Sequence, residues 1–246
     1  MRLLLINPNI SPEISELICA EAQRAASAGT EIEVVTAPFG VAYIETRFEA
    51  LIGAYAAAEI AAERHTEFDA VIVAAFGDPG LPGLREALAI PVTGLTEAAL
   101  ASASLLGDRF SIVAISQRIR AWYRETVRLC GFEQRLASIR GLDERSDRVG
   151  NIQSDQRERL VELAHRCVDE DGADVIILAG APLAGLARSV HGRIPVPSVD
   201  GVSSAVRHAE SLVALQPGTA TRGSFAAPPT KPNRGLSPAL VRLLAR

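Results

Sequence analysis

The sequence predicts an α/β protein built from two similar halves, each with a parallel sheet, and a cleft between them. Short apolar runs alternate with longer amphipathic ones along the 246 residues, as strands and helices do in such folds. The apolar runs are almost continuous, which is typical of parallel strands covered on both faces. A set of these elements recurs at an offset of about 105 residues, which indicates an internal duplication.

The predicted strands are short runs of Val, Ile, Leu, Phe and Ala. They cover residues 3–6, 32–35, 70–75, 91–93, 110–114 and 175–179. Helical periodicity fills the intervals over 12–27, 47–65, 80–88, 97–106, 118–130, 154–171, 183–190 and 202–214. The first helix has a clear start, because Ser11 is an N-cap residue, Pro12 suits the first helical position and Glu13 is an early acid.

The repeat divides the chain. Residues 68–75 resemble residues 173–180, and the match continues from 80–81 to 185–186 and from 90–91 to 196–197. Residues 1–107, with part of the C-terminal region, are predicted to form the first half, and residues 108–215 the second. Unrelated strand–helix units can share such composition, but here the spacing holds across three elements.

Residues 216–246 have a different character. Gly, Pro, Ala and Thr without hydrophobic periodicity predict an extended tail, and a short amphipathic helix follows from residue 236. Its apolar stripe can dock on its own chain or on a neighbouring one, and we expect a homo-oligomer. The stripe consists of Leu236, Leu240, Leu243 and Leu244.

Composition excludes several classes of function. The net charge is −4 and no long run of like charges occurs, so a nucleic-acid-binding surface is not expected. No apolar stretch reaches the roughly 20 residues that span a membrane, and the apolar N-terminus has no small-residue cleavage site after it. Cys19, Cys130 and Cys167 lie in or at the end of helical patterns, without metal-like spacing, which indicates reduced thiols in a cytoplasmic protein.

Polar residues gather in the loops that follow the predicted strands. Ligands bind at the carboxyl ends of strands in open α/β sheets, so we expect these loops to meet at the cleft. Asn7 and Asn9 precede a helix start and either present amides to a carboxylate or imide oxygen or only make the turn. Asp78 either caps the following helix or faces a ligand, and Thr96 is either an N-cap or a hydroxyl donor.

Candidate catalytic groups follow from the same placement. Tyr43 and Glu45 lie in the loop after the second strand, and Glu45 is either a general base with a pKa raised by burial or an acid favoured by the helix dipole. Ser116 holds in the second half the place that Asn9 holds in the first. The predicted catalytic residues are Tyr43, Glu45 and Asp78. The predicted substrate-binding residues are Asn7, Asn9, Ala75, Phe76, Gly77, Thr96, Ser116, Gly180, Ala181 and Pro182.

These motifs, in this order, resemble the Asp/Glu/hydantoin racemase superfamily, and within it the hydantoin and allantoin racemase branch. The resemblance rests on Asn-Pro-Asn at 7–9, on residues 75–81, 94–99 and 200–202, and on the tail at 235–240. It covers nearly the whole chain. It implies two pseudosymmetric α/β domains, a small-molecule substrate in the cleft between them, no metal and no cofactor.

The resemblance also implies a mechanism from which this sequence departs. In the family two cysteines, one in each half, remove and return a proton on opposite faces of a carbon atom. Aligned on the loops, these positions hold Ala75 and Gly180, and neither side chain can carry a proton. The sequence therefore predicts a non-racemase isomerase, lyase or hydrolytic step on a small ureide, cyclic imide or amino-acid-like substrate. An inactive racemase with both cysteines replaced and a non-catalytic metabolite-binding protein are the alternatives.

Overall fold

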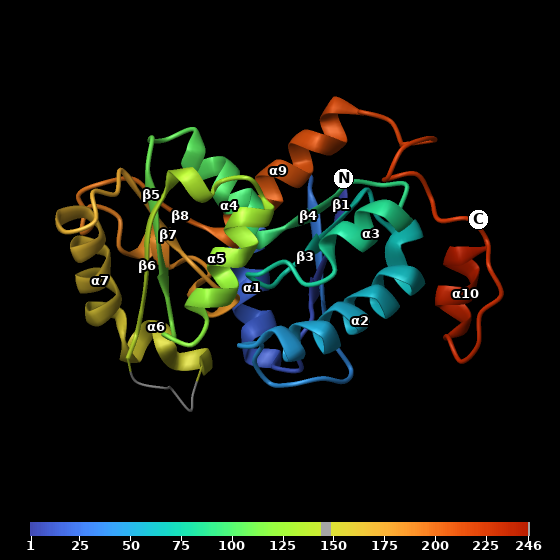
Figure 1. Ribbon diagram of the computed structural model, residues 1–246, viewed down its shortest axis with the longest axis horizontal. Coiled ribbons are helices and arrows are strands. Elements are labelled where there is room, and N and C mark those ends of the chain that lie inside the picture. Colours follow the sequence, from blue (N-terminus) through green and yellow to red (C-terminus); the bar gives the residue numbers. More distant parts are fainter. Residues whose placement is uncertain (144–148, 246) are drawn as a thin grey trace.

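Two four-stranded parallel sheets, each covered by helices, form the body of the protein in a computed structural model that describes residues 1–143 and 149–245 (Figure 1). The first sheet has the order β2-β1-β3-β4 and the second β6-β5-β7-β8. The same strand order in both sheets confirms the α/β fold with two similar halves. The strands are β1 (Arg2–Asn7), β2 (Glu31–Thr36), β3 (Ala70–Val73), β4 (Val92–Gly94), β5 (Phe110–Ala114), β6 (Leu136–Gly141), β7 (Val175–Leu178) and β8 (Ser198–Asp200).

The helices lie between the strands, close to where their periodicity predicts them. They are α1 (Pro12–Ala25), α2 (Arg47–Arg64), α3 (Leu81–Ala87), α4 (Leu95–Ser104), α5 (Arg120–Leu129), α6 (Ile152–Asp155), α7 (Arg157–Asp169), α8 (Leu186–Ser189), α9 (Gly201–Leu215) and α10 (Pro238–Leu244). Short 3₁₀ turns include η3 (Val149–Asn151) and η4 (Ala181–Leu183). The predicted start of α1 is confirmed, because the Ser11 side chain accepts a hydrogen bond from Ile14 N at 3.3 Å.

Strands β6 and β8 were not predicted. Strand β6 lies at the edge of its sheet, where Ser138 and Arg140 each bond the carboxylate of Asp171 at 2.6 Å. Such polar residues interrupt the apolar run by which a strand is recognised. Strand β8 has only three residues, too few for a pattern. The predicted helix over 183–190 is instead η4 and the short α8, because the chain adopts a positive φ of 77° at Gly185.

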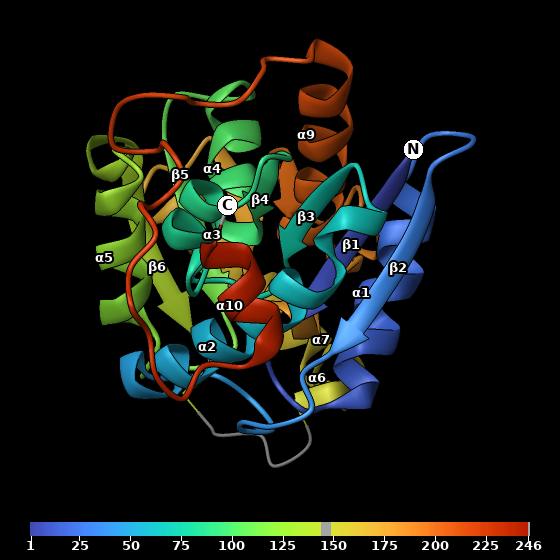
Figure 2. The ribbon, with the colours of Figure 1, turned by 90° about the vertical axis from the view of Figure 1, so that its right-hand side faces the viewer.

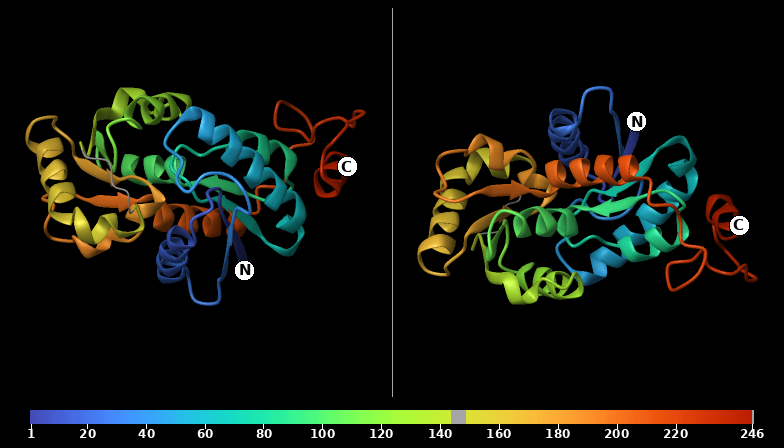
Figure 3. Two further views of the ribbon diagram at one scale, coloured as in Figure 1. Left: turned by 90° about the horizontal axis from the view of Figure 1, so that it is seen from below. Right: turned by 90° about the horizontal axis from the view of Figure 1, so that it is seen from above.

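Helices α4 and α9 join the two halves. Helix α4 packs on β7 and β8 of the second sheet, whereas α9 packs on β3 and β4 of the first. The two helices also pack against each other along the middle of the molecule (Figure 3). They cross closely, since a Cβ on Gly201 would lie 2.7 Å from the Cβ of Leu95. One apolar cluster consequently extends through both sheets, and Leu5, Ile72, Ile112 and Ile177 all belong to it.

The C-terminal tail crosses the first half as a strap. Residues 216–235 are almost all exposed, and α10 then packs against α2 of the same chain (Figure 2). Ser237 caps α10 and also donates a hydrogen bond to Glu59, while Leu240 and Leu243 are buried. The leucine stripe of α10, from which we expected self-association, therefore packs on α2 of the same chain. Arg246, at the end of the predicted helix, lies outside the described residues.

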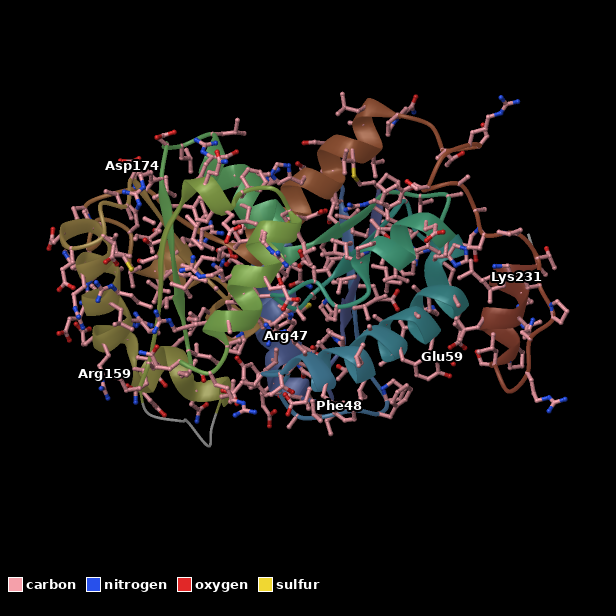
Figure 4. The ribbon with its side chains drawn as sticks, in the orientation of Figure 1. Arg47, Phe48, Glu59, Arg159, Asp174 and Lys231 are labelled. Atoms are coloured by element: carbon pink, nitrogen blue, oxygen red, sulfur yellow. The ribbon has the colours of Figure 1, made fainter. Side chains whose placement is uncertain are left out.

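Other apolar side chains remain exposed on α2. Phe48 is 72% exposed (Figure 4), and Leu51 and Tyr55 of the same helix are exposed as well. The homo-oligomer stays a prediction.

Within the described ranges, no helix has both the length and the apolar character needed to cross a membrane.

Candidate active site

The loops after β3 and β7, one from each half, contact the same side chain. The Phe76 ring lies 4.7 Å from the ring of Tyr123, measured between centroids. On the other side, a Cβ added to Gly180 would lie 3.8 Å from the Tyr123 hydroxyl. Tyr123 comes from α5, and its side chain is buried. This tyrosine therefore marks the point at which the two halves bring their predicted loops together.

Tyr43 and Glu45 approach the same point from the first half. The hydroxyl oxygen of Tyr43 is buried and has no hydrogen-bond partner in the part of the chain that the structure describes. Burial raises the pKa of Tyr43, and the nearby charge of Glu45 raises it further. Burial also raises the pKa of Tyr123, with Tyr43 and Glu45 among its electrostatic neighbours. Both phenols therefore stay protonated at neutral pH and can donate hydrogen bonds, but they are poor bases.

Asp78 caps a helix, but not the helix that follows it. Helix α3 begins after Gly80 without a side-chain cap, so the predicted cap of this helix is wrong. The Asp78 carboxylate instead accepts hydrogen bonds from the backbone N–H groups of Thr96 at 2.8 Å and Glu97 at 2.9 Å, at the start of α4. The cap residue of α4 is Gly94, where a Cβ would lie only 2.4 Å from the Asp78 carboxyl carbon. Because Gly94 has no side chain, the Asp78 carboxylate has room to accept the N–H groups at the start of α4, as an N-cap side chain would.

The loop around Asp78 is held tightly. Gly77 N donates to the Thr96 hydroxyl at 2.6 Å, and a Cβ on Gly77 would overlap the Trp122 indole at 2.2 Å. Gly77 has a φ of 101°, so both its backbone conformation and its neighbour require glycine. Burial raises the pKa of Asp78 to about 7, although two backbone hydrogen bonds oppose the shift.

We expect this buried carboxyl to make the protein less stable as the pH rises from about 4 to about 7. The Asp78 pKa is 3.8 in the unfolded chain and about 7 in the fold, so the folded state binds the proton more tightly. The stabilising contribution is complete below pH 3.8 and is lost as the pH rises through 7. The slope approaches about 1.4 kcal/mol per pH unit. Urea unfolding between pH 5 and pH 8 measures it.

Asp78→Asn is the matched control for this pH dependence. The variant should be less stable than the native chain at pH 5, because the amide NH₂ cannot accept one of the two N–H bonds, and the difference should narrow at pH 8. Its unfolding free energy should nevertheless vary less with pH than that of the native chain. Equal slopes for the two proteins would contradict the assignment.

The side-chain amides of Asn7 and Asn9, which follow β1, differ in how many of their hydrogen-bonding groups are already paired. Asn7 Nδ2 donates to Asn9 Oδ1 at 3.1 Å and to the Ser15 hydroxyl at 2.9 Å, and Asn7 Oδ1 accepts from Asn9 N. The Asn7 side chain is thus used within its own turn. Asn9 Oδ1 also accepts from Ser11 N, but Asn9 Nδ2 makes no hydrogen bond with any described residue. Asn9 Nδ2 is the amide group that remains for a ligand.

The predicted second-half residues lie in two separate turns. The Ser116 hydroxyl accepts a hydrogen bond from Arg118 N at 3.2 Å, within the loop after β5. Ala181 and Pro182 form η4, and Gln153 fixes this turn by donating to Pro182 O at 2.9 Å and to Ala184 O at 2.8 Å. The role of Ser116 in substrate binding stays a prediction.

Ala75 and Gly180 differ in backbone conformation. Gly180 has a φ of 106° and a ψ of 144°, a combination that is comfortable only for glycine. Ala75 is not among the residues with positive φ, and it is 7% exposed. The backbone therefore accepts a larger side chain at 75 much more readily than at 180. That these two positions correspond to the family's cysteines stays a prediction.

A cavity of about 670 Å³ opens beside the Asp78 loop, between α3, α4, α5 and α9. Of the predicted site residues, only Gly77 and Asp78 line it. Cys130 also lines it, and burial raises the pKa of this thiol to about 12, so it is not a thiolate at neutral pH. At the rim, Arg47 of α2 and Glu125 of α5 form an ion pair at 2.5 Å that bridges the two halves (Figure 4).

Sequence reasoning found Tyr43, Glu45, Phe76 and Gly180 at this junction, but it missed Tyr123. Its signal was present, because Trp122, Tyr123, Thr126 and Val127 form the buried face of α5. A helix that follows a predicted site loop places its inward face near that loop. Among the described residues, no group of three or more His, Cys, Asp or Glu side chains is arranged to hold a metal ion.

Comparison with known proteins agrees with this architecture. The family model for Asp/Glu/hydantoin racemase matches residues 3–209. A hydantoin racemase of Paenarthrobacter aurescens is 39% identical over 233 residues, which cover 94% of this chain and 99% of that protein. The solved structure of an allantoin racemase from Klebsiella pneumoniae has a TM-score of 0.92 at 36% identity and covers 98% of each chain. For an allantoin racemase from Pseudomonas fluorescens the TM-score is 0.86 at 37% identity, covering 96% of this chain and 100% of that one. The chain therefore belongs to the Asp/Glu/hydantoin racemase family.

Proposed function

We propose that this chain is a cofactor-independent enzyme that acts on a small cyclic ureide, of the hydantoin or allantoin kind, at the carbon next to a carbonyl. Its similarity to hydantoin and allantoin racemases over almost the whole chain supports the substrate class. The observation that carries the proposal is the junction of the halves. There a carboxylate, Glu45, is an electrostatic neighbour of two buried phenols that stay protonated.

The chemistry needs a base and a hydrogen-bond donor. A proton on a carbon next to a carbonyl becomes removable when the charge that develops on the carbonyl oxygen is stabilised. Glu45 supplies the base and the unpartnered hydroxyl of Tyr43 supplies a donor. The difference in proton affinity between a carboxylate and a phenol beside it suits this division of roles. Asn9 Nδ2 holds a further polar group of the substrate.

We further propose that proton transfer takes place on one face of the substrate carbon. Racemisation needs a proton carrier on each face, and Ala75 and Gly180 provide none at the two loops that meet here. An isomerase, lyase or hydrolytic step then replaces racemisation. The alternative is a non-catalytic protein that binds the same ligand at these residues and does not convert it.

Exchange in D₂O tests both parts of the proposal. Each enantiomer of allantoin and of 5-methylhydantoin is incubated with the protein, and proton NMR follows the ring C–H while circular dichroism follows optical activity. We expect deuterium uptake, or a new product, from one enantiomer without loss of optical activity beyond the protein-free control. Loss of optical activity in step with exchange would show racemisation instead. Binding without exchange or product would favour the binding protein.

The remaining expectations concern partners and location. We propose that the protein is a cytoplasmic homo-oligomer that binds neither nucleic acid nor membranes, on the sequence grounds given above. Sedimentation velocity at micromolar concentration tests the oligomer, and a single species at 26.1 kDa would contradict it.

A further inference from the structure

Tyr123 occupies the place beside residue 180 that a side chain on that residue would reach. A Cβ built on Gly180 would lie 3.8 Å from the Tyr123 hydroxyl oxygen and 3.5 Å from Cδ of Pro182. These are ordinary contact distances, so an atom beyond that Cβ has the hydroxyl as its neighbour. The phenol oxygen therefore lies next to the backbone of Gly180 and leaves room there for a Cβ.

The phenol is held in a fixed position. Its ring packs on Phe76 at 4.7 Å and on Trp122 at 5.7 Å between centroids, and the residue is only 2% exposed. Its hydroxyl makes no hydrogen bond with any residue in 1–143 or 149–245. A hydroxyl that is held by its packed ring and has no partner among the described residues is preorganised for a polar group from a ligand.

The chemistry of the surroundings decides what this hydroxyl can do. Burial and the nearby Tyr43, Asp78 and Glu45 all oppose its ionisation. It therefore keeps its proton, so it is suited to donate a hydrogen bond and unsuited to act as a base. An oxygen that gains negative charge during the reaction is its natural partner.

We propose that the Tyr123 hydroxyl is a catalytic hydrogen-bond donor to the carbonyl oxygen of the substrate, on the side of the site where residue 180 has no side chain. This inference rests on the proposed function, because it takes the substrate to be a cyclic ureide. It adds a donor from the second half to the Tyr43 donor from the first. The developing charge is then held between phenols from both halves.

Tyr123→Phe removes the hydroxyl and leaves the ring in place. We expect the rate constant of the D₂O exchange or turnover reaction to fall by about 10²-fold, with KM changed only a few-fold and the melting temperature retained. Barbiturate, a planar ring anion with enolate-like oxygens, should bind the variant at least about 10-fold more weakly in calorimetry. Tyr55→Phe is the matched control, since Tyr55 is 46% exposed on α2 and bonds Glu59. It should change neither quantity.

A second measurement observes Tyr123 in the native chain and does not depend on the folding of Tyr123→Phe. The chain has three tyrosines, so labelling their Cζ atoms with ¹³C gives three NMR signals, two of which are assigned with Tyr55→Phe and Tyr43→Phe. Barbiturate should shift the Tyr123 signal. A Tyr123 signal that stays unmoved by a bound ligand, or equal rates for the native chain and Tyr123→Phe, would overturn the Tyr123 assignment alone. A native chain that neither binds nor converts allantoin, 5-methylhydantoin or barbiturate would overturn the proposed function and this inference together.

Discussion

Glu45→Gln should lower the rate of the catalysed reaction by about 10²- to 10⁴-fold and leave the melting temperature unchanged. The amide has the shape of the carboxylate but cannot accept a proton. The Glu45 carboxylate makes no hydrogen bond with a described residue, and only its backbone N–H is used, donating to Glu49 at 2.8 Å. The fold therefore does not depend on the charge at this position. Initial rates in D₂O and thermal denaturation measure the two quantities.

Glu49→Gln provides the contrast. Its carboxylate accepts hydrogen bonds from the N–H groups of Glu45 and Thr46 and completes the capping box at the start of α2. Both bonds end on one carboxylate oxygen, so the amide oxygen of Gln can keep them. This variant should lose no more than about 1 kcal/mol of stability, from the missing charge at the helix N-terminus, and keep most of its rate. If Glu45→Gln were as active as the native chain, Glu45 would not be the base and the one-face mechanism would need another group.

The fold was predictable because its strands are buried on both faces. Runs such as 70–75 and 175–179 carry little besides apolar residues, and their repetition at a fixed offset reveals the duplicated sheet before any coordinates are seen. The prediction failed at β6, where Ser138 and Arg140 bind Asp171 from an edge strand. The polar residues of an edge strand are held by partners that are distant in the sequence. A local pattern of residues does not reveal those partners.

The sequence indicated the loops of the candidate site, but not the residues that contact them. Positions after strands identified Tyr43, Glu45 and the loops at 75–78 and 180–182. The role of Asp78 depends on Gly94, a residue far along the chain whose missing side chain makes room for it. Tyr123 lies likewise beside Gly180, which is distant from it in the sequence. Both relations arise from tertiary contacts, so no spacing in the sequence expresses them.

Gly180→Cys should destabilise the protein by about 1–3 kcal/mol, whereas Ala75→Cys should cost much less. At 180 the φ of 106° and ψ of 144° disfavour any residue with a side chain. At 75 the backbone has no such conformation. Urea unfolding of the two single variants and of the double variant measures the difference. The loss in the double variant should come almost entirely from position 180.

Gly180→Ala separates the two causes of this loss. Its Cβ fits the space, at 3.5 and 3.8 Å from its neighbours, so any destabilisation reports the backbone alone. Any further loss in Gly180→Cys then measures the effect of the sulfur atom on its neighbours. If Gly180→Cys were as stable as the native chain, and the double variant racemised hydantoins at once, the chain would be an inactivated racemase. A strained Gly180→Cys means instead that the backbone and Tyr123 are adapted to a glycine, and that replacing one sulfur atom does not restore the family's two-thiol site.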